Sequence, residues 1–320
     1  MKRRVGVALL LCLGSALLVC ADPLEDALAL FPESSDVRVP LTEEGRSQLE
    51  AAIDAIKTAL GVPDYLDEES EDEVGAFTVA MEDKHLVNKL SQAYYTYADA
   101  FLRDTPVANQ RAVFLRGKQW GFKSLRMNPA FVSFEEQDGF VAAVQQEIDV
   151  AALFWANGNW LQWAEPDIFA AIKAGIAAKS LAMSERILEL EPSHSIYGTY
   201  RALAAFWQGM PSDPISAFLF TGNRMQDYDK LLHYFCHLVD EPGFCTDVAE
   251  VIDPVCLRYF ENRVMFAEYY LMPLDYWEDA KRVLESVITE PIGDEFPLYN
   301  ALSQLNAADL LVDVNAELDL

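Results

Sequence analysis

The chain has 320 residues, of which 52% are hydrophobic, so it can form one large core or two medium ones. Its 51 acidic and 24 basic residues give a formal charge of −27, which argues against nucleic acid and anionic membrane surfaces as partners. A balance this acidic is typical of a well-solvated surface and does not by itself indicate a ligand.

The first 21 residues have the organisation of a secretory signal. Lys2, Arg3 and Arg4 precede an apolar run, residues 5–19, which is shorter than the roughly 20 residues of a membrane-spanning helix. Small residues before position 22 favour cleavage there, which would remove residues 1–21. The alternative is that Cys20 is the lipidated cysteine of a bacterial lipoprotein, tethering the mature chain to a membrane.

Residues 22–85 are predicted to form N-terminal helices and an acidic loop. A helix is expected after Thr42, a favourable N-cap, and before Gly61, which suits the position after a helix. Between them the apolar residues share one helical face. The acidic stretch at residues 66–74 interrupts this pattern and lacks the central glycine of a calcium loop, so it is predicted to be a solvated loop.

Residues 86–320 are predicted to form the main helical domain. No convincing run of alternating polar and apolar residues is present, so the fold class is predicted to be all-α. The run at residues 139–163 is apolar on nearly all sides, which is typical of a central helix. The expected helices cover residues 86–102, 110–128, 139–163, 170–192, 195–207, 255–272, 275–291 and 296–318.

Three of these segments end in a similar way, at Pro129, Pro192 and Pro291. The prolines are 63 and 99 residues apart, close to two and three units of a tetratricopeptide (TPR) repeat of about 34 residues. The small and aromatic positions of that repeat match poorly. We therefore predict a degenerate TPR-like array of helical hairpins, in which neighbouring pairs cover each other's apolar faces.

Three cysteines, Cys236, Cys245 and Cys256, follow the signal region, and an exported location permits a disulfide between two of them. The pairs Cys236–Cys245 and Cys245–Cys256 are both open. His233 and His237 lie at helical spacing from Cys236 and could join Cys245 in a zinc site. A helix that carries these residues by chance is the preferred interpretation, so neither a metal nor another cofactor is expected.

Sequence motifs of common enzyme classes are absent. The chain contains no G-x-x-x-x-G-K-[ST], H-E-x-x-H, G-x-S-x-G or C-x-x-C pattern. None of its four histidines lies beside an obvious nucleophile motif. The protein is therefore expected not to be an enzyme, and no catalytic residue is predicted.

The stretch DVAALFWANGNWLQW, residues 149–163, holds three of the six tryptophans. In a helix Trp155, Asn159 and Trp163 follow one another at a spacing of four residues, which suits the wall of a wet passage for a small ligand. The alternative is that the tryptophans belong to an ordinary core and that the asparagines cap a break in the helix at Gly158. Trp160, Tyr200 and Trp207 are further candidates for the wall of the passage.

Asp149 lies among apolar neighbours at the start of this stretch. A lone buried carboxylate is costly, so Asp149 is expected to pair with a base from the neighbouring helix. The candidates are Arg111 and Arg116.

Several ordered blocks between residues 93 and 311 resemble the T-component of tripartite ATP-independent periplasmic (TRAP) transporters, the TatT family. The blocks are AYYTYADAFL, RAVFLRGKQWGFKSL, DVAALFWANGNWLQW, SLAMSERILELEPSHSIYGTYRAL, ENRVMFAEYYLMPLDYWEDAKRVLESVI and PLYNALSQLNAADLL. Each block alone is weak, and their joint order carries the resemblance. Residues 211–256 and the residues before Cys20 depart from the family's pattern.

The resemblance implies an exported, periplasmic protein, commonly a lipoprotein, with a TPR-like fold and a homotrimeric assembly. It also implies docking to the periplasmic solute-binding P-component of the transporter. A pore through each protomer would pass a small ligand, which can be hydrophobic, to or from that partner. Separate membrane subunits would carry out transport. The alternative function is that of a generic exported TPR-like scaffold that binds peptides.

Overall fold

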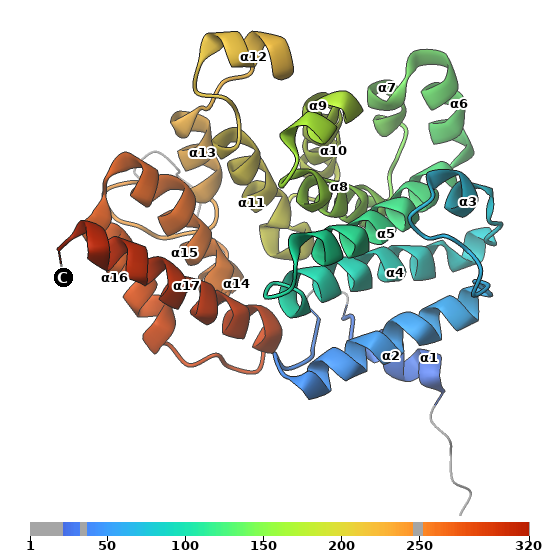
Figure 1. Cartoon of the computed structure of the whole chain (residues 1–320), viewed down its shortest axis with the longest axis horizontal. Helices are drawn as coiled ribbons and strands as arrows, with labels where there is room; N and C mark the ends of the chain where they lie inside the picture. Colours follow the sequence, from blue (N-terminus) through green and yellow to red (C-terminus); the bar gives the residue numbers. More distant parts are fainter. Residues whose placement is uncertain (1–21, 33–36, 246–251, 320) are drawn as a thin grey trace, which may run out of the picture.

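The computed structural model describes residues 22–32, 37–245 and 252–319, with the backbone alone at residues 168–170. All regular elements within these ranges are helices, which confirms the all-α class (Figure 1). No helix in the same ranges is both long and apolar enough to cross a membrane. The predicted signal and Cys20 lie outside the described residues.

The N-terminal helices form around the apolar face of α2, which buries Leu49 and Ile56. Thr42 caps the start of α2 by accepting a hydrogen bond from the Gly45 amide, and Gly61 ends it in the left-handed conformation, both as predicted. The elements are α1 (Pro23–Ala29), α2 (Glu43–Leu60), α3 (Glu71–Ala76), η1 (Met81–Asp83), α4 (Lys84–Thr96) and the π-helical turn η2 (Tyr97–Phe101). The predicted acidic loop was partly wrong, because Ser70 caps the short helix α3 inside it.

The middle group packs α8 against α5 and α10. Its elements are α5 (Val107–Arg126), α6 (Pro129–Asp138), α7 (Phe140–Val144), α8 (Val150–Ala164), α9 (Ile168–Ala174) and α10 (Ile176–Leu190). The single helix predicted over residues 139–163 is two helices, because the Asp149 carboxylate accepts a hydrogen bond from the Ala152 amide and starts α8 afresh. Gly175, in the left-handed conformation, likewise divides the helix predicted over residues 170–192.

The C-terminal group follows α11 and ends with the pair α16 and α17. Its elements are α11 (His194–Gln208), α12 (Pro214–Phe220), α13 (Tyr228–Phe235), α14 (Pro254–Arg258), α15 (Phe260–Phe266), the π-helical turn η3 (Ala267–Leu271), η4 (Met272–Leu274), α16 (Trp277–Thr289) and α17 (Pro297–Glu317). Cys236, just after α13, is bonded to Cys245, so the first of the two predicted disulfide pairings is confirmed. Cys256 is buried and free.

Two glycines of α5 allow α8 to approach closely. A Cβ atom on Gly121 would lie 2.6 Å from the Cα atom of Ala156, and one on Gly117 would lie 2.1 Å from the Asn159 side-chain oxygen. A Cβ atom at Gly121 would meet the α8 backbone, and one at Gly117 would require the buried Asn159 side chain to move, so both positions favour glycine. The pair fixes how α5 and α8 lie against each other.

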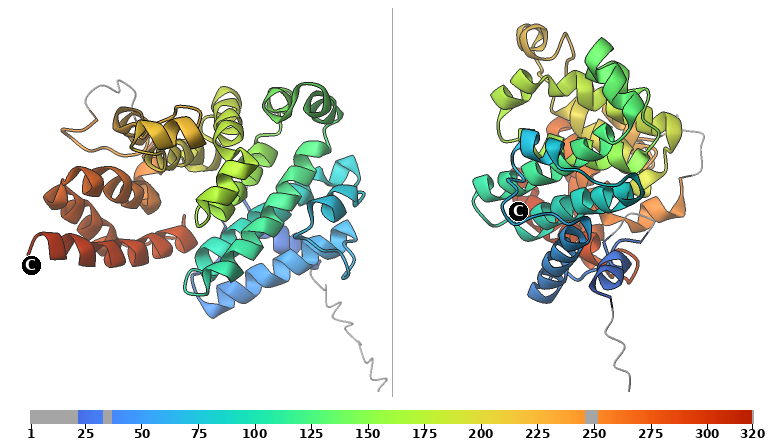
Figure 2. Two further views of the ribbon diagram at one scale, coloured as in Figure 1. Left: turned by 45° about the horizontal axis from the view of Figure 1, so that its top comes forward. Right: turned by 90° about the vertical axis from the view of Figure 1, so that its right-hand side faces the viewer.

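The C-terminal helix returns to the N-terminal helices. Arg103, which follows η2, donates hydrogen bonds to Asn306 and Asp309 of α17 at 2.9 and 2.7 Å. Tyr299 and Leu302 share a buried apolar cluster with residues of α2 and α4. The left view of Figure 2 shows the C-terminal group at the left and α1 and α2 at the lower right. The boundary predicted at residue 85 falls within the apolar cluster that Tyr299 and Leu302 join, because that cluster contains residues from both sides of it.

Candidate functional site: an internal cavity with acidic and aromatic walls

A cavity of about 810 Å³ lies among α8, α10, α11, α15 and α17. Its volume is in the range of sites for drug-sized molecules, roughly 300–1,000 Å³. Each of the three buried apolar clusters in the described chain contains residues that also line the cavity. The cavity therefore exists because these helix groups meet around it, and no single segment of sequence encloses it.

Each π-helical turn places an acid on the cavity wall. Asp99 belongs to η2 and Glu268 belongs to η3. A π-helical turn inserts one extra residue into a helix and shifts the direction of the following side chains, and such turns are frequent at functional sites. The two turns lie far apart in sequence and meet at the same cavity.

The charged lining is predominantly acidic. Among the lining residues four carboxyl groups face two guanidinium groups, namely Asp99, Glu165, Glu261 and Glu268 against Arg201 and Arg224. The two arginines are already engaged, because Arg201 pairs with Glu261 and Arg224 donates a hydrogen bond to the Thr221 carbonyl. Within the described chain, the other three acids form no ion pair.

Burial changes the protonation of these acids. The pKa of Asp99 is raised to about 7, chiefly by burial and then by the nearby Glu261 and Glu165 carboxylates, while Arg103 acts to lower it. Desolvation by the surrounding protein raises the pKa of the Glu165 carboxyl, although this residue is exposed to solvent at the edge of the cavity. Burial, followed by the Glu165 charge, also raises the pKa of Glu268. The wall therefore holds carboxyl groups that lack a compensating positive charge.

A left-handed turn at the start of α11 forms another part of the wall. Ser195, Ile196 and Tyr197 have φ values of 55°, 52° and 58°. This region is unfavourable for side chains with a Cβ atom, above all for β-branched isoleucine. The Arg201 guanidinium donates hydrogen bonds to the carbonyl groups of Ser195 and Ile196, at 3.0 and 2.8 Å, and so holds the strained turn in place.

Aromatic side chains provide most of the remaining surface. The Trp155 ring lies 5.6 Å from the Tyr95 ring and 4.9 Å from the Phe154 ring, and all three residues line the cavity. Tyr269 and Tyr299 join them from η3 and α17. Burial raises the pKa of Tyr95 and Tyr299 well above the usual value, so their hydroxyl groups stay protonated and can donate hydrogen bonds.

Two buried polar side chains on the wall have unused hydrogen-bonding capacity. Asn157 is 3% exposed and donates from its amide nitrogen to Ser184, yet its side-chain oxygen has no partner among the described residues. The hydroxyl of Thr199, a residue that is 1% exposed, is also without a partner there. A buried polar atom without a hydrogen bond is costly, and both oxygens are themselves buried, so they lie behind the cavity surface.

Of the six residues predicted to face a passage, only Trp155 lines this cavity. The Asn159 side chain is fully buried, and its amide nitrogen donates to the Ser91 carbonyl, the Ser91 hydroxyl and the Trp155 carbonyl. Trp160 is 2% exposed and packs edge-on against Phe122 in an apolar cluster. For Asn159 and Trp160 the passage interpretation was wrong, because Asn159 lies between α4 and α5 and Trp160 packs against α5 and α7.

The other three predicted residues also lie away from the cavity wall. The Trp163 ring packs under the Arg111 guanidinium at 4.7 Å, and its carbonyl accepts a hydrogen bond from the same side chain. Tyr200 packs against His237, with ring centres 4.7 Å apart. The Lys230 ammonium lies 3.8 Å from the centre of the Trp207 ring.

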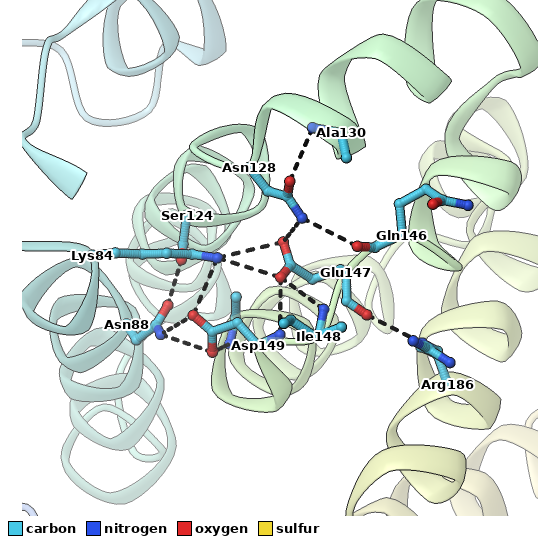
Figure 3. Close-up of polar contacts among 11 residues, drawn as sticks. Lys84, Asn88, Ser124, Asn128, Ala130, Gln146, Glu147, Ile148, Asp149 and Arg186 are labelled. Carbon is cyan, nitrogen blue, oxygen red and sulfur yellow. Dashed lines mark hydrogen bonds and ion pairs between the residues drawn. The ribbon is translucent and has the colours of Figure 1, made fainter. Parts of the chain in front are cut away.

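Asp149 has different partners from those predicted. Lys84 lies 3.2 Å from its carboxylate and Asn88 donates hydrogen bonds to both of its oxygens (Figure 3). Lys84 also contacts Glu147, so one ammonium group serves two carboxylates. Arg111 and Arg116 instead bind Asp167 and Glu69. The pairing with either arginine was wrong, because the start of α8 lies beside the first turns of α4.

Sequence reasoning missed the acids of the cavity. Asp99 and Glu268 stand in apolar helical runs, which is the one local sign that they differ from the many surface carboxylates. In the described residues no group of three or more His, Cys, Asp and Glu side chains is placed to hold a metal ion. No family model and no curated protein matches the chain.

Proposed function

We propose that this protein is an exported, TPR-like binding and docking protein that holds a small molecule in its internal cavity and exchanges it with a periplasmic solute-binding protein. The observation that carries the proposal is the cavity of about 810 Å³ with acidic and aromatic side chains on its wall. This role is the one implied by the resemblance to the T-component of TRAP transporters, in which separate membrane subunits carry out transport.

The exposed face of α12 supports a docking role for this protein. Ile215, Phe218 and Leu219 are 73%, 69% and 59% exposed on a helix that projects from the rest of the molecule (Figure 1). The residues that follow, Phe220 and Thr221, line the cavity. A contiguous exposed apolar patch is typical of an interaction surface. The occupant we propose for it is the solute-binding protein, since a partner on α12 sits next to the cavity wall.

The sequence supports two further parts of the proposal. The signal organisation of residues 1–21 supports export, with either cleavage before Asp22 or lipidation at Cys20. The family resemblance supports a homotrimer. Mass spectrometry of the exported protein distinguishes the two N-termini, since cleavage leaves an unmodified Asp22 and lipidation leaves an acylated Cys20. Sedimentation of the same protein measures the assembly.

Capture of the solute-binding protein tests the docking proposal. The mature chain should retain the P-component encoded with its transporter, and Phe218→Ser should weaken that retention. Val312→Ser removes a side chain that is 69% exposed on α17 and serves as the control with unchanged capture. Equal capture by both variants contradicts a role for α12. Retention of unstructured peptides in place of the P-component favours a generic scaffold.

A further inference from the structure

We infer that the cavity binds a protonated organic amine that carries an apolar or aromatic body. This inference rests on the proposed function as a ligand-holding protein and names the chemical class of its ligand. It is carried by two features of the wall, which are unpaired carboxyl groups and aromatic rings.

The first feature is the charge of the wall. Asp99, Glu165 and Glu268 line the cavity from η2, from the residue after α8 and from η3, and within the described chain none of them forms an ion pair. A cation placed among them would gain attraction that the protein itself does not supply. These acids belong to no metal-holding group in the described residues, which favours an organic cation over a metal ion.

An anionic ligand fits the same wall poorly. Arg201 is the most buried base of the lining, and its guanidinium is already used by the Glu261 carboxylate, the Asn262 side-chain oxygen and the carbonyl groups of Ser195 and Ile196. Arg224 donates to the Thr221 carbonyl at the end of α12. An incoming carboxylate or phosphate would have to displace one of these acceptors and would lie near unpaired acids.

The second feature is aromatic. Tyr95, Trp155 and Tyr269 contribute to the same lining as the unpaired acids. The face of an aromatic ring attracts a cation, and the attraction strengthens where water is excluded. The rings also offer apolar surface to the body of the ligand. Carboxylates alone would suit a small hydrated ion, whereas carboxylates beside tyrosine and tryptophan suit an amine with an apolar body.

The raised pKa values of the acids agree with this assignment. Burial raises the pKa of Asp99, Glu165 and Glu268 because it disfavours their charged forms, which a nearby cation would favour. Glu261 and Arg103 are the other charged groups that act on Asp99, and Arg201 pairs with Glu261. An ammonium ion would take the place of the bound protons. Its binding should therefore tighten from pH 6 to pH 8, where an alkylamine stays protonated.

The test compares three probes of the same shape on the full mature chain by calorimetry. The probes are 3-phenylpropylamine, the neutral 3-phenylpropan-1-ol and the anionic 3-phenylpropanoate. The amine should bind about tenfold or more tightly than the alcohol, with the propanoate weakest. Glu268→Gln should weaken amine binding about tenfold while leaving binding of the alcohol, which reports an intact cavity, unchanged. Glu136→Gln, an exposed change of the same kind on α6, should leave both unchanged.

Three results would overturn the inference. They are binding of the alcohol or the propanoate as tight as that of the amine, equal amine binding by Glu268→Gln and the parent protein, and no binding of the amine. In the first case the cavity still holds a small molecule, so the proposed function stands and the assigned ligand class fails. In every case the capture of the solute-binding protein is measured separately, so failure of docking is told apart from failure of the amine assignment.

Discussion

The Arg201 guanidinium and the Glu261 carboxylate lie 3.2 Å apart on the cavity wall. The same guanidinium sits 4.6 Å from the centre of the Tyr259 ring and holds the left-handed turn through the carbonyl groups of Ser195 and Ile196. One side chain thus joins the start of α11 to α15 and balances one of the four acids that line the cavity.

Arg201→Met should destabilise the protein by about 3–5 kcal/mol, the usual cost of breaking a buried ion pair from one side. The substitution leaves Glu261 without its partner and removes the donors that hold the strained turn. Urea unfolding followed by circular dichroism measures the change. Arg258→Met is the matched control, since the Arg258–Glu295 pair is exposed and such pairs contribute about 0–1 kcal/mol. Equal losses in the two variants would contradict this account.

The stability of the protein should fall as pH rises from about 4 to about 7 because of Asp99. Its folded pKa is raised to about 7, above the unfolded value of about 3.9, so between these values the folded state binds more protons than the unfolded state. The contribution of this carboxyl is therefore favourable below about pH 4, is lost as pH rises and is fully lost above about pH 7. Asp99→Asn should be more stable than the parent protein at pH 8.

A comparison of unfolding curves at pH 5 and pH 8 checks the Asp99 prediction. The parent protein should lose more stability between the two values than the Asp99→Asn variant does. Glu261 and Glu165 raise the pKa of Asp99, and Arg103 lowers it, so all three remain unchanged in this experiment. Identical pH profiles of the two proteins would show that Asp99 does not titrate in this range.

Gly121→Ala should destabilise the contact between α5 and α8 by about 1–3 kcal/mol, as overpacking does in a filled core. The added methyl group would lie 2.6 Å from the Cα atom of Ala156, and a helix backbone cannot move aside as a side chain can. Gly75→Ala in α3 meets no atom within 4 Å and should be neutral or slightly stabilising, because alanine favours helix. Thermal unfolding of Gly121→Ala and Gly75→Ala measures the difference. Similar melting temperatures of the two variants would contradict the close approach of α8 to α5 at Gly121.

Trp160→Ala should cost about 3–5 kcal/mol, the usual loss for a large-to-small change in a core. Trp163→Ala should cost clearly less, because its side chain is partly exposed and packs under Arg111. Asn159→Leu should cost about 1–3 kcal/mol, since it removes the donor to the Ser91 and Trp155 carbonyl groups. Urea unfolding of the three variants gives these values. A stable Asn159→Leu protein would restore the passage interpretation for this residue.

Removing the Cys236–Cys245 disulfide should lower stability by about 2–3 kcal/mol, the effect of opening a loop of this short length. The measurement is unfolding with and without dithiothreitol. The Cys236→Ala/Cys245→Ala double variant should be less stable than the parent protein and insensitive to the reductant. Equal stability of the double variant and the oxidised parent protein would contradict this prediction.

Local sequence patterns determined the fold class and several helix boundaries. Thr42 and Gly61 bracket α2 because side-chain capping and the left-handed conformation of glycine act within a few residues. The spacing of apolar residues predicted helices in the same way, since a helix face is set by a period of 3.6 residues. The break before α8 was missed because the apolar pattern continues through Asp149, whose carboxylate accepts a hydrogen bond from the Ala152 amide and starts a new helix.

Tertiary structure alone decided where the candidate site lies. Asp99 and Glu268 become neighbours of one cavity because two π-helical turns from distant parts of the chain meet there, and their helical periodicity carries no information about that meeting. The same limit applies to Asn159. Its sequence spacing suits a passage and a core equally, and the close approach of α5 through Gly117 buries it. Which helix faces meet depends on contacts between distant residues, whereas the sequence pattern reports only which faces are apolar.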